Sequence, residues 1–280
     1  MLRPQSSINA TCDSYHGVAM ALWRQAVAAL PHRCDVAFGA HEEQRLDLFF
    51  PSEAPAAGPL PIFLDIHGGG WTHGYKEWMA LAAPAVTSCS AIFASLGYRL
   101  APMARHPTQV QDCLSAIAWL VEHAGEIGGD ASRIHVGGHS AGAHLAAMAS
   151  LRTDLHAAHD LPPGVIRSCF CYSGLYDLRG AHARAEMPGV SPVPMLADAS
   201  AEDDASPLLA VRKVDTAFHI SWGQQELEVF QDQGRRFADA LVAAGNQVTV
   251  ETPDLDHFWI HLDHARGDSD WVRALHARMR

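Results

Sequence analysis

The alternation of apolar and polar residues predicts strands separated by helices along most of the chain. Strands are predicted at residues 60–66, 91–96, 165–172, 217–222 and 247–251, and the first of these is a strongly apolar run. Apolar residues recur at helical spacing within residues 76–88, 108–126 and 227–244. Parallel strands need such crossover helices, so this order predicts an α/β fold with a mostly parallel sheet covered on both faces.

The N-terminal part of the chain departs from this alternation. Residues 13–30 are predicted to form a helix that Asp13 or Ser14 caps, because apolar residues recur there at helical spacing. Residues 34–38 and 45–50 are predicted to form a pair of strands ahead of the parallel sheet.

The proline- and alanine-rich residues 51–61 are interpreted as a surface loop and not as a linker between domains. The sequence shows no internal repeat and no sign of a second domain. We therefore expect a single domain over residues 1–280.

A sharp turn between a strand and a helix is the most informative local pattern. An apolar run at 134–136 leads through Gly138-His139-Ser140-Ala141-Gly142 into an alanine-rich stretch, residues 143–151. This is the G-x-S-x-G pattern of a nucleophile elbow, in which a side chain at either glycine would collide with the neighbouring strand or helix. The pattern predicts that Ser140 is a nucleophile; the alternative is a glycine-rich helix start that Ser140 caps.

A glycine triplet follows the apolar run at 60–66, within His67-Gly68-Gly69-Gly70-Trp71. Such a backbone can approach a ligand closely, and acyl transfer needs N–H donors aimed at a developing oxyanion. The triplet alone is more typical of a flexible turn. Together with the elbow it predicts an oxyanion hole made by the N–H groups of Gly69, Gly70 and Ala141.

A serine nucleophile needs a base within hydrogen-bonding distance and a carboxylate that orients the base. Position along the chain selects His257 as the base, because it follows the last predicted strand. His261 and His264 fall in a predicted helix, and we expect them at the surface. Asp254 and Asp256 lie too close to His257 in sequence to orient it, so we expect them to form the turn.

The acid is expected after the strand at 217–222, since the chain order of this triad is serine, acid, histidine. Glu226 is the predicted acid, and Glu228 is the second candidate. Asp177, which ends the preceding strand, would serve only if the acid had moved to that position.

Composition narrows the functional classes. The hydrophobic fraction of 48% is typical of a globular protein. The net charge of −11 argues against nucleic-acid binding. The six cysteines match no zinc spacing, and we expect them reduced. Residues 1–17 lack the apolar run of a signal peptide, and no run reaches membrane-spanning length. These features predict a cytoplasmic protein without metal or cofactor that acts on a small molecule, away from membranes, and that can form a homodimer.

The motifs resemble those of known hydrolases. From about residue 34 onward the chain resembles the α/β-hydrolases, and HGGGW with GHSAG resembles esterases of the hormone-sensitive-lipase type. The longer GHSAGAHLAAM at 138–148, HGGGW at 67–71 and DHF at 256–258 are closer to kynurenine formamidases (arylformamidases). By this resemblance, Ser140 is the nucleophile and His257 the base. The family has Asp where this chain has Glu226.

The resemblance implies hydrolysis of an N-formyl aryl amide such as N-formylkynurenine, in a role in tryptophan catabolism. An aryl amine leaving group favours aromatic walls, and the candidates are Trp71, Tyr75, Tyr176 and Trp259, with Trp78 beside them. Core packing is the alternative for each of them. Residues 178–206, rich in proline, alanine and acids, are predicted to be a short insertion that caps the pocket; the alternative is an ordinary surface loop.

Three other functions stay open. A general carboxylesterase for small esters would need the same triad with a different pocket. A non-catalytic small-molecule receptor on the same fold is a second alternative, although such proteins tend to lose a triad member. A metal hydrolase that uses Asp65, His67 and His73 is a third, but these residues lack the helical histidine spacing of common zinc motifs.

Overall fold

The computed structural model describes residues 4–53, 58–181 and 193–279. Within these residues the strands form one eight-stranded sheet in the order β1-β2-β4-β3-β5-β6-β7-β8. The strands are β1 (His32–Ala37), β2 (Arg45–Phe49), β3 (Leu60–Ile66), β4 (Ile92–Leu96), β5 (Gly129–His139), β6 (Ile166–Tyr172), β7 (Ala217–Ser221) and β8 (Val248–Glu251). Strand β2 pairs antiparallel with β1 and β4, and the remaining pairs are parallel. The predicted mostly parallel sheet is confirmed.

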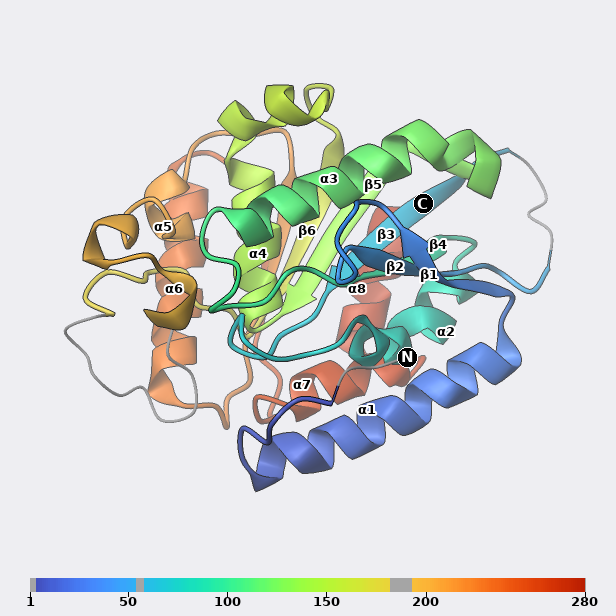
Figure 1. The fold of residues 1–280 in the computed structure, drawn as a ribbon, viewed down its shortest axis with the longest axis horizontal. Coiled ribbons are helices and arrows are strands. Elements are labelled where there is room, and N and C mark those ends of the chain that lie inside the picture. The colour runs from blue at the N-terminus through green and yellow to red at the C-terminus, as the bar shows by residue number, and fades with distance from the viewer. Residues whose placement is uncertain (1–3, 54–57, 182–192, 280) are drawn as a thin grey trace.

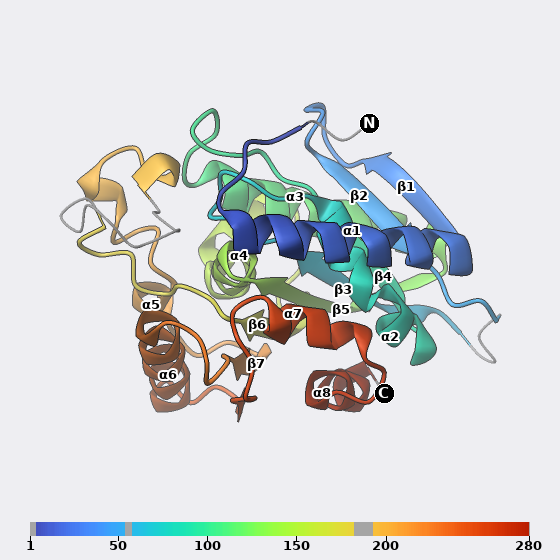
Figure 2. The ribbon, with the colours of Figure 1, turned by 90° about the horizontal axis from the view of Figure 1, so that it is seen from below.

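Helices cover both faces of this sheet (Figure 1). The α-helices are α1 (Ala10–Ala29), α2 (Ala83–Ser88), α3 (Thr108–His123), α4 (Ala141–Leu151), α5 (Pro207–Ala210), α6 (Glu228–Ala243), α7 (Trp259–Leu262) and α8 (Asp270–Met279). Short 3₁₀ helices lie at Lys76–Ala82, Ala124–Ile127, Thr153–His159, Val193–Met195, Ala199–Ala201 and Asp263–Ala265. Helix α1 runs beside α7 in both views (Figure 1, Figure 2).

The side chains of each central strand alternate between two cores. Leu64 of β3 and Val136 of β5 belong to the core under α3, α4 and α6. Phe63 and Phe170, which point the other way, belong to the core under α1, α2 and α8. Because both faces are buried, these strands read as continuous apolar runs in the sequence, and this is why their positions could be predicted.

Three predicted boundaries change in the structure. Helix α1 begins at Ala10, and its cap is Asn9, whose side chain accepts the Cys12 N–H at 2.9 Å, instead of Asp13 or Ser14. The helix predicted over 76–88 is a 3₁₀ helix followed by α2, because Pro84 has no N–H for an α-helical bond. Strand β5 spans 11 residues, well beyond 134–136, since its start pairs with Leu60 of β3.

The predicted cap at 178–206 lies only partly within the described residues, since 182–192 fall outside them. The described remainder packs on the α3–α4 side of the sheet. His144 Nε2 of α4 donates to the Ala205 carbonyl at 2.7 Å, and Arg152 forms an ion pair with Asp204 at 2.7 Å. This region is therefore held against the scaffold, and the described part of it does not line the cavity beside Ser140.

Candidate active site

The turn between β5 and α4 holds Ser140 in a strained backbone conformation, with φ 56° and ψ −116°. A Cβ on Gly138 would lie 2.4 Å from the Gly142 carbonyl carbon, and a Cβ on Gly142 would lie 1.9 Å from the Ile66 carbonyl oxygen. Both positions therefore require glycine, for the steric reason that the sequence pattern predicts. The turn places Ser140 at the carboxyl end of the central strand.

His257 lies within hydrogen-bonding distance of this serine. Its Nε2 is 3.1 Å from Ser140 Oγ, and its Nδ1 is 2.9 Å from Glu226 Oε2. The turn that carries the histidine is fixed by Asp256, whose Oδ1 accepts the N–H groups of Phe258 at 2.9 Å and Trp259 at 2.8 Å. Asp256 thus forms the turn, as the sequence predicts.

The carboxylate of Glu226 has no exposed surface and is held by two further donors. Its Oε1 accepts the Gly223 N–H at 2.8 Å and a short hydrogen bond from the Ser173 hydroxyl. Glu228, the other candidate, is exposed at the start of α6. A carboxylate with its oxygens fixed in this way can hold one imidazole tautomer and stabilise the imidazolium.

The glycine loop after β3 lies beside the serine. Gly69 has φ +108° and its carbonyl accepts the His73 N–H at 2.9 Å, which closes the loop tightly. Gly69 and Gly70 line the same cavity as Ser140. Ala141 is the first residue of α4, so its N–H has no carbonyl partner within that helix.

A cavity of about 410 Å³ opens at Ser140. Its aromatic lining consists of Tyr15, Trp78, Phe230 and Phe258. One wall comes from the N-terminal segment, with Ile8, Asn9, Thr11, Cys12 and Tyr15. The sequence does not predict this wall, because helix α1 carries no recognisable motif. Of the aromatic candidates, Trp78 alone lines this cavity.

The structure places the other aromatic candidates away from this cavity. Trp71 is fully buried and donates its indole N–H to His144 Nδ1 at 3.2 Å. Tyr176 is 1% exposed and stacks on Phe237, with ring centroids 4.1 Å apart. Trp259 is 57% exposed, on the first turn of α7. The pocket role predicted for these residues is corrected: the first two pack in the core, and the third faces solvent.

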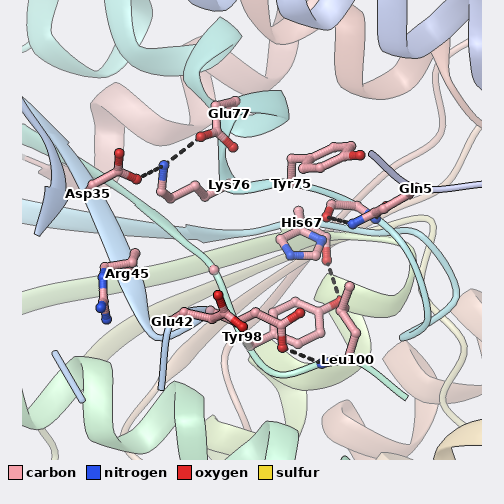
Figure 3. A pocket seen from close by; sticks show the side chains of 13 residues that line it. Gln5, Asp35, Glu42, Arg45, His67, Tyr75, Lys76, Glu77, Tyr98 and Leu100 are labelled. Carbon is pink, nitrogen blue, oxygen red and sulfur yellow. Dashed lines mark hydrogen bonds and ion pairs between the residues drawn. The ribbon is translucent and has the colours of Figure 1, made fainter. Parts of the chain in front are cut away.

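Tyr75 lines a second cavity of about 370 Å³, together with His67 and Tyr98 (Figure 3). Here Lys76 bridges three carboxylates, Asp35 and Asp47 at 2.9 Å and Glu77 at 2.6 Å. Burial alone would lower the pKa of the Lys76 ammonium, but Asp47 and Glu77 together raise it. This network anchors the chain immediately after the glycine loop and so helps to fix that loop.

Asp65, His67 and His73, the residues of the metal-hydrolase alternative, make hydrogen-bonding and stacking contacts with neighbouring side chains. Asp65 accepts a hydrogen bond from the Tyr172 hydroxyl at 2.5 Å, and His67 stacks on Tyr98 with centroids 4.2 Å apart (Figure 3). His73 Nε2 lies 3.0 Å from Ser6 Oγ. Among the described residues, no group of three or more His, Cys, Asp or Glu side chains is arranged to hold a metal ion.

His261 and His264 are 0% and 1% exposed, so their predicted surface position is wrong. His264 stacks on Trp271 with centroids 3.7 Å apart, and His261 Nδ1 lies 2.7 Å from the Tyr15 hydroxyl. His261 of α7 points inward because α1 packs over that helix, whereas His264, in the 3₁₀ helix at Asp263–Ala265, packs on Trp271 of α8. The helical pattern contains neither tertiary contact.

A family model described as BD-FAE matches residues 46–241, which is most of the chain. The chain belongs to the BD-FAE family. It is 30% identical to a protein named kynurenine formamidase from Danio rerio, over 81% of this chain and 74% of that protein. It is also 30% identical to a protein named esterase LipC from Mycobacterium tuberculosis, over 84% of this chain but only 62% of LipC.

Among solved structures, esterase B from Lactobacillus Rhamnosis aligns with a TM-score of 0.76 at 18% identity, over 97% of each chain. This likeness confirms the α/β-hydrolase fold. The similarity to proteins named as a formamidase and an esterase identifies the chain as a hydrolase. Within the described ranges, no helix has both the length and the apolar character needed to cross a membrane.

Proposed function

We propose that this hydrolase uses Ser140 as nucleophile, His257 as base and Glu226 as the acid that orients the base. The observation that carries the proposal is the continuous hydrogen-bonded chain from Ser140 Oγ through the His257 ring to the buried Glu226 carboxylate. The strained elbow and the steric need for glycine at Gly138 and Gly142 support the same assignment.

In the proposed reaction, His257 takes the Ser140 proton as the serine oxygen bonds to the substrate carbonyl carbon. The N–H groups of Gly69, Gly70 and Ala141 stabilise the resulting oxyanion. His257 then protonates the leaving amine or alcohol as its bond to the carbonyl carbon breaks. Water, deprotonated by the same imidazole, hydrolyses the acyl-enzyme and restores Ser140.

For the substrate we propose an N-formyl aryl amide such as N-formylkynurenine, which would yield formate and an aryl amine. A formyl group needs little acyl space, and an aromatic leaving group suits the ring-lined cavity beside Ser140. The similarity to a protein named kynurenine formamidase supports this assignment. A place in tryptophan catabolism would follow from that substrate.

A small carboxylic ester is the second candidate. The charged residues in the described lining of the cavity are both acids, Glu226 and Asp256. Such a lining favours an uncharged substrate over one that bears a carboxylate. The similarity to a protein named esterase LipC points the same way.

The test is hydrolysis of N-formylkynurenine beside p-nitrophenyl acetate and butyrate, with the Ser140→Ala protein as control. A higher kcat/KM for the formamide supports the formamidase assignment, and fast turnover of the esters alone supports the esterase. Ser140→Ala is expected to keep the fold and to lose activity about 10³- to 10⁶-fold. Wild-type turnover by Ser140→Ala would overturn the triad, and a folded wild-type protein without turnover of any substrate would favour the receptor alternative.

A further inference from the structure

His139, the middle residue between Gly138 and Ser140, contacts the proposed base as well as preceding the proposed nucleophile. Its Nε2 lies 2.7 Å from the backbone carbonyl oxygen of His257, and the two rings are 4.7 Å apart between centroids. Only 3% of the His139 side chain is exposed. One buried side chain thus links the elbow to the loop that carries the base.

The His139 ring is itself held on two sides. It stacks on His261 of α7 with centroids 5.3 Å apart and on Tyr172 of β6 with centroids 5.8 Å apart. Its Nδ1 edge lies against the glycine loop, since a Cβ added to Gly68 would come within 3.2 Å of that atom. His139 therefore has little freedom to move relative to the elbow, the sheet or the oxyanion loop.

The protonation state of this ring follows from its partner. A backbone carbonyl only accepts hydrogen bonds, so Nε2 of His139 carries the proton and donates it. Burial, and next the charge of His257, hold the pKa of the His139 imidazole well below its usual range. The ring stays a neutral donor while the adjacent base gains and loses its proton.

We infer that His139 is a positioning residue for the reaction: its N–H fixes the backbone of His257 and thereby holds that imidazole between Ser140 Oγ and the Glu226 carboxylate. Asp256 fixes the following turn through the Phe258 and Trp259 N–H groups, but the carbonyl of His257 itself is held by His139. Misplacement of a catalytic group by about 1 Å can cost about 100-fold in rate. This inference rests on the proposed function of the triad.

The experiment compares His139→Phe, which keeps a ring but removes the donor, with His139→Gln, whose amide N–H can replace Nε2. His139→Leu is prepared in parallel as a smaller apolar variant, in case the phenyl ring does not fit. His264→Phe is the matched control, because that histidine is as buried and as stacked but does not contact His257. Folding is checked by circular dichroism and Tm, and kcat and KM are measured with p-nitrophenyl butyrate.

We expect kcat to fall about 10- to 100-fold in His139→Phe and His139→Leu, with KM within about twofold. His139→Gln should recover most of the loss, and His264→Phe should change Tm alone. Wild-type kcat in a folded apolar variant would overturn the inference, as would an equal loss in His139→Gln or in His264→Phe. Failure of the triad itself is distinguished by Ser140→Ala, which would then retain activity.

Discussion

The nucleophile elbow and the wall of the substrate cavity are built in opposite ways. The elbow occupies one continuous stretch, in which β5, Ser140 and α4 follow each other and two glycines meet steric limits. The cavity wall is assembled from residues of the N-terminal segment, the 3₁₀ helix at Lys76–Ala82, the loop before α6 and the turn before α7. A local motif therefore predicts the chemistry, whereas the shape of the cavity depends on segments that meet only in the folded protein.

The same contrast explains which predicted residues the structure brings together. Ser140, His257 and Glu226 each sit at a turn that follows a strand, and parallel strands bring such turns to one edge of the sheet. Ring type, in contrast, does not determine which way an aromatic side chain points. Trp71 and Tyr176 have suitable rings but point into the core.

The largest expected effect concerns the acid of the triad. Glu226→Gln should lower kcat about 10³- to 10⁴-fold, because an amide cannot stabilise the imidazolium and can hold the wrong tautomer of His257. Steady-state kinetics with p-nitrophenyl butyrate measure this change. Glu228→Gln is the matched control, and it should stay within about twofold of wild type because Glu228 is exposed. A larger loss in Glu228→Gln would reverse the assignment of the acid.

The next effect tests the steric basis of the elbow. Gly142→Ala should lower Tm by about 5–10 °C, since its Cβ would meet the Ile66 carbonyl at 1.9 Å and the backbone must shift. Differential scanning calorimetry checks the shift. Gly125→Ala, where nothing lies within 4 Å of the added Cβ, should change Tm by less than about 2 °C. Equal Tm values for the two variants would contradict a sterically required glycine.

A smaller effect tests the cavity wall. Thr11→Trp places a bulky side chain on α1 beside the cavity and should raise KM for p-nitrophenyl butyrate about fivefold, with less effect on the acetate. Val18→Trp is the control, since Val18 is exposed on the same helix and outside the cavity lining. If both variants behaved alike, the N-terminal segment would not shape the substrate site.

The smallest effect concerns the strand that leads into the glycine loop. Burial raises the pKa of the Asp65 carboxyl to about 8, so the folded protein keeps a proton that the unfolded chain, with a value near 3.9, releases. The stability that this group contributes is full below about pH 4 and is lost as pH rises towards 8.

Asp65→Asn cannot ionise, and the amide oxygen can still accept the Tyr172 hydroxyl. The gain in Tm over wild type should therefore be larger at pH 8 than at pH 5 by at least about 3 °C. Thermal melts across this pH range give the difference between variant and wild type. A difference that stays constant or shrinks as pH rises would show that Asp65 is ionised in the folded protein.

The positions of the central strands could be predicted because burial on both faces makes each strand a continuous apolar run. The limits of the helices were less predictable. Asn9 caps α1 through its side chain four residues before the first predicted helical position, and Pro84 divides the segment after the glycine loop. The inward orientation of His261 also depends on α1 packing over α7, and that of His264 on its contact with Trp271 of α8; no local pattern records either contact.

By itself, the sequence determined the fold class, the elbow and the order of the proposed catalytic residues, because each of these follows from local backbone sterics or from strand periodicity. Only the tertiary structure decided which carboxylate meets His257, that His139 holds this residue from the elbow, and that the N-terminal segment forms the wall of the cavity. Glu226 meets His257 across 31 positions, and the other two features depend on contacts between residues more than 60 positions apart, such as Trp78 with His16 and His139 with His257. Contacts of this kind are set by how the helices and the sheet pack on one another, and not by any single stretch of chain.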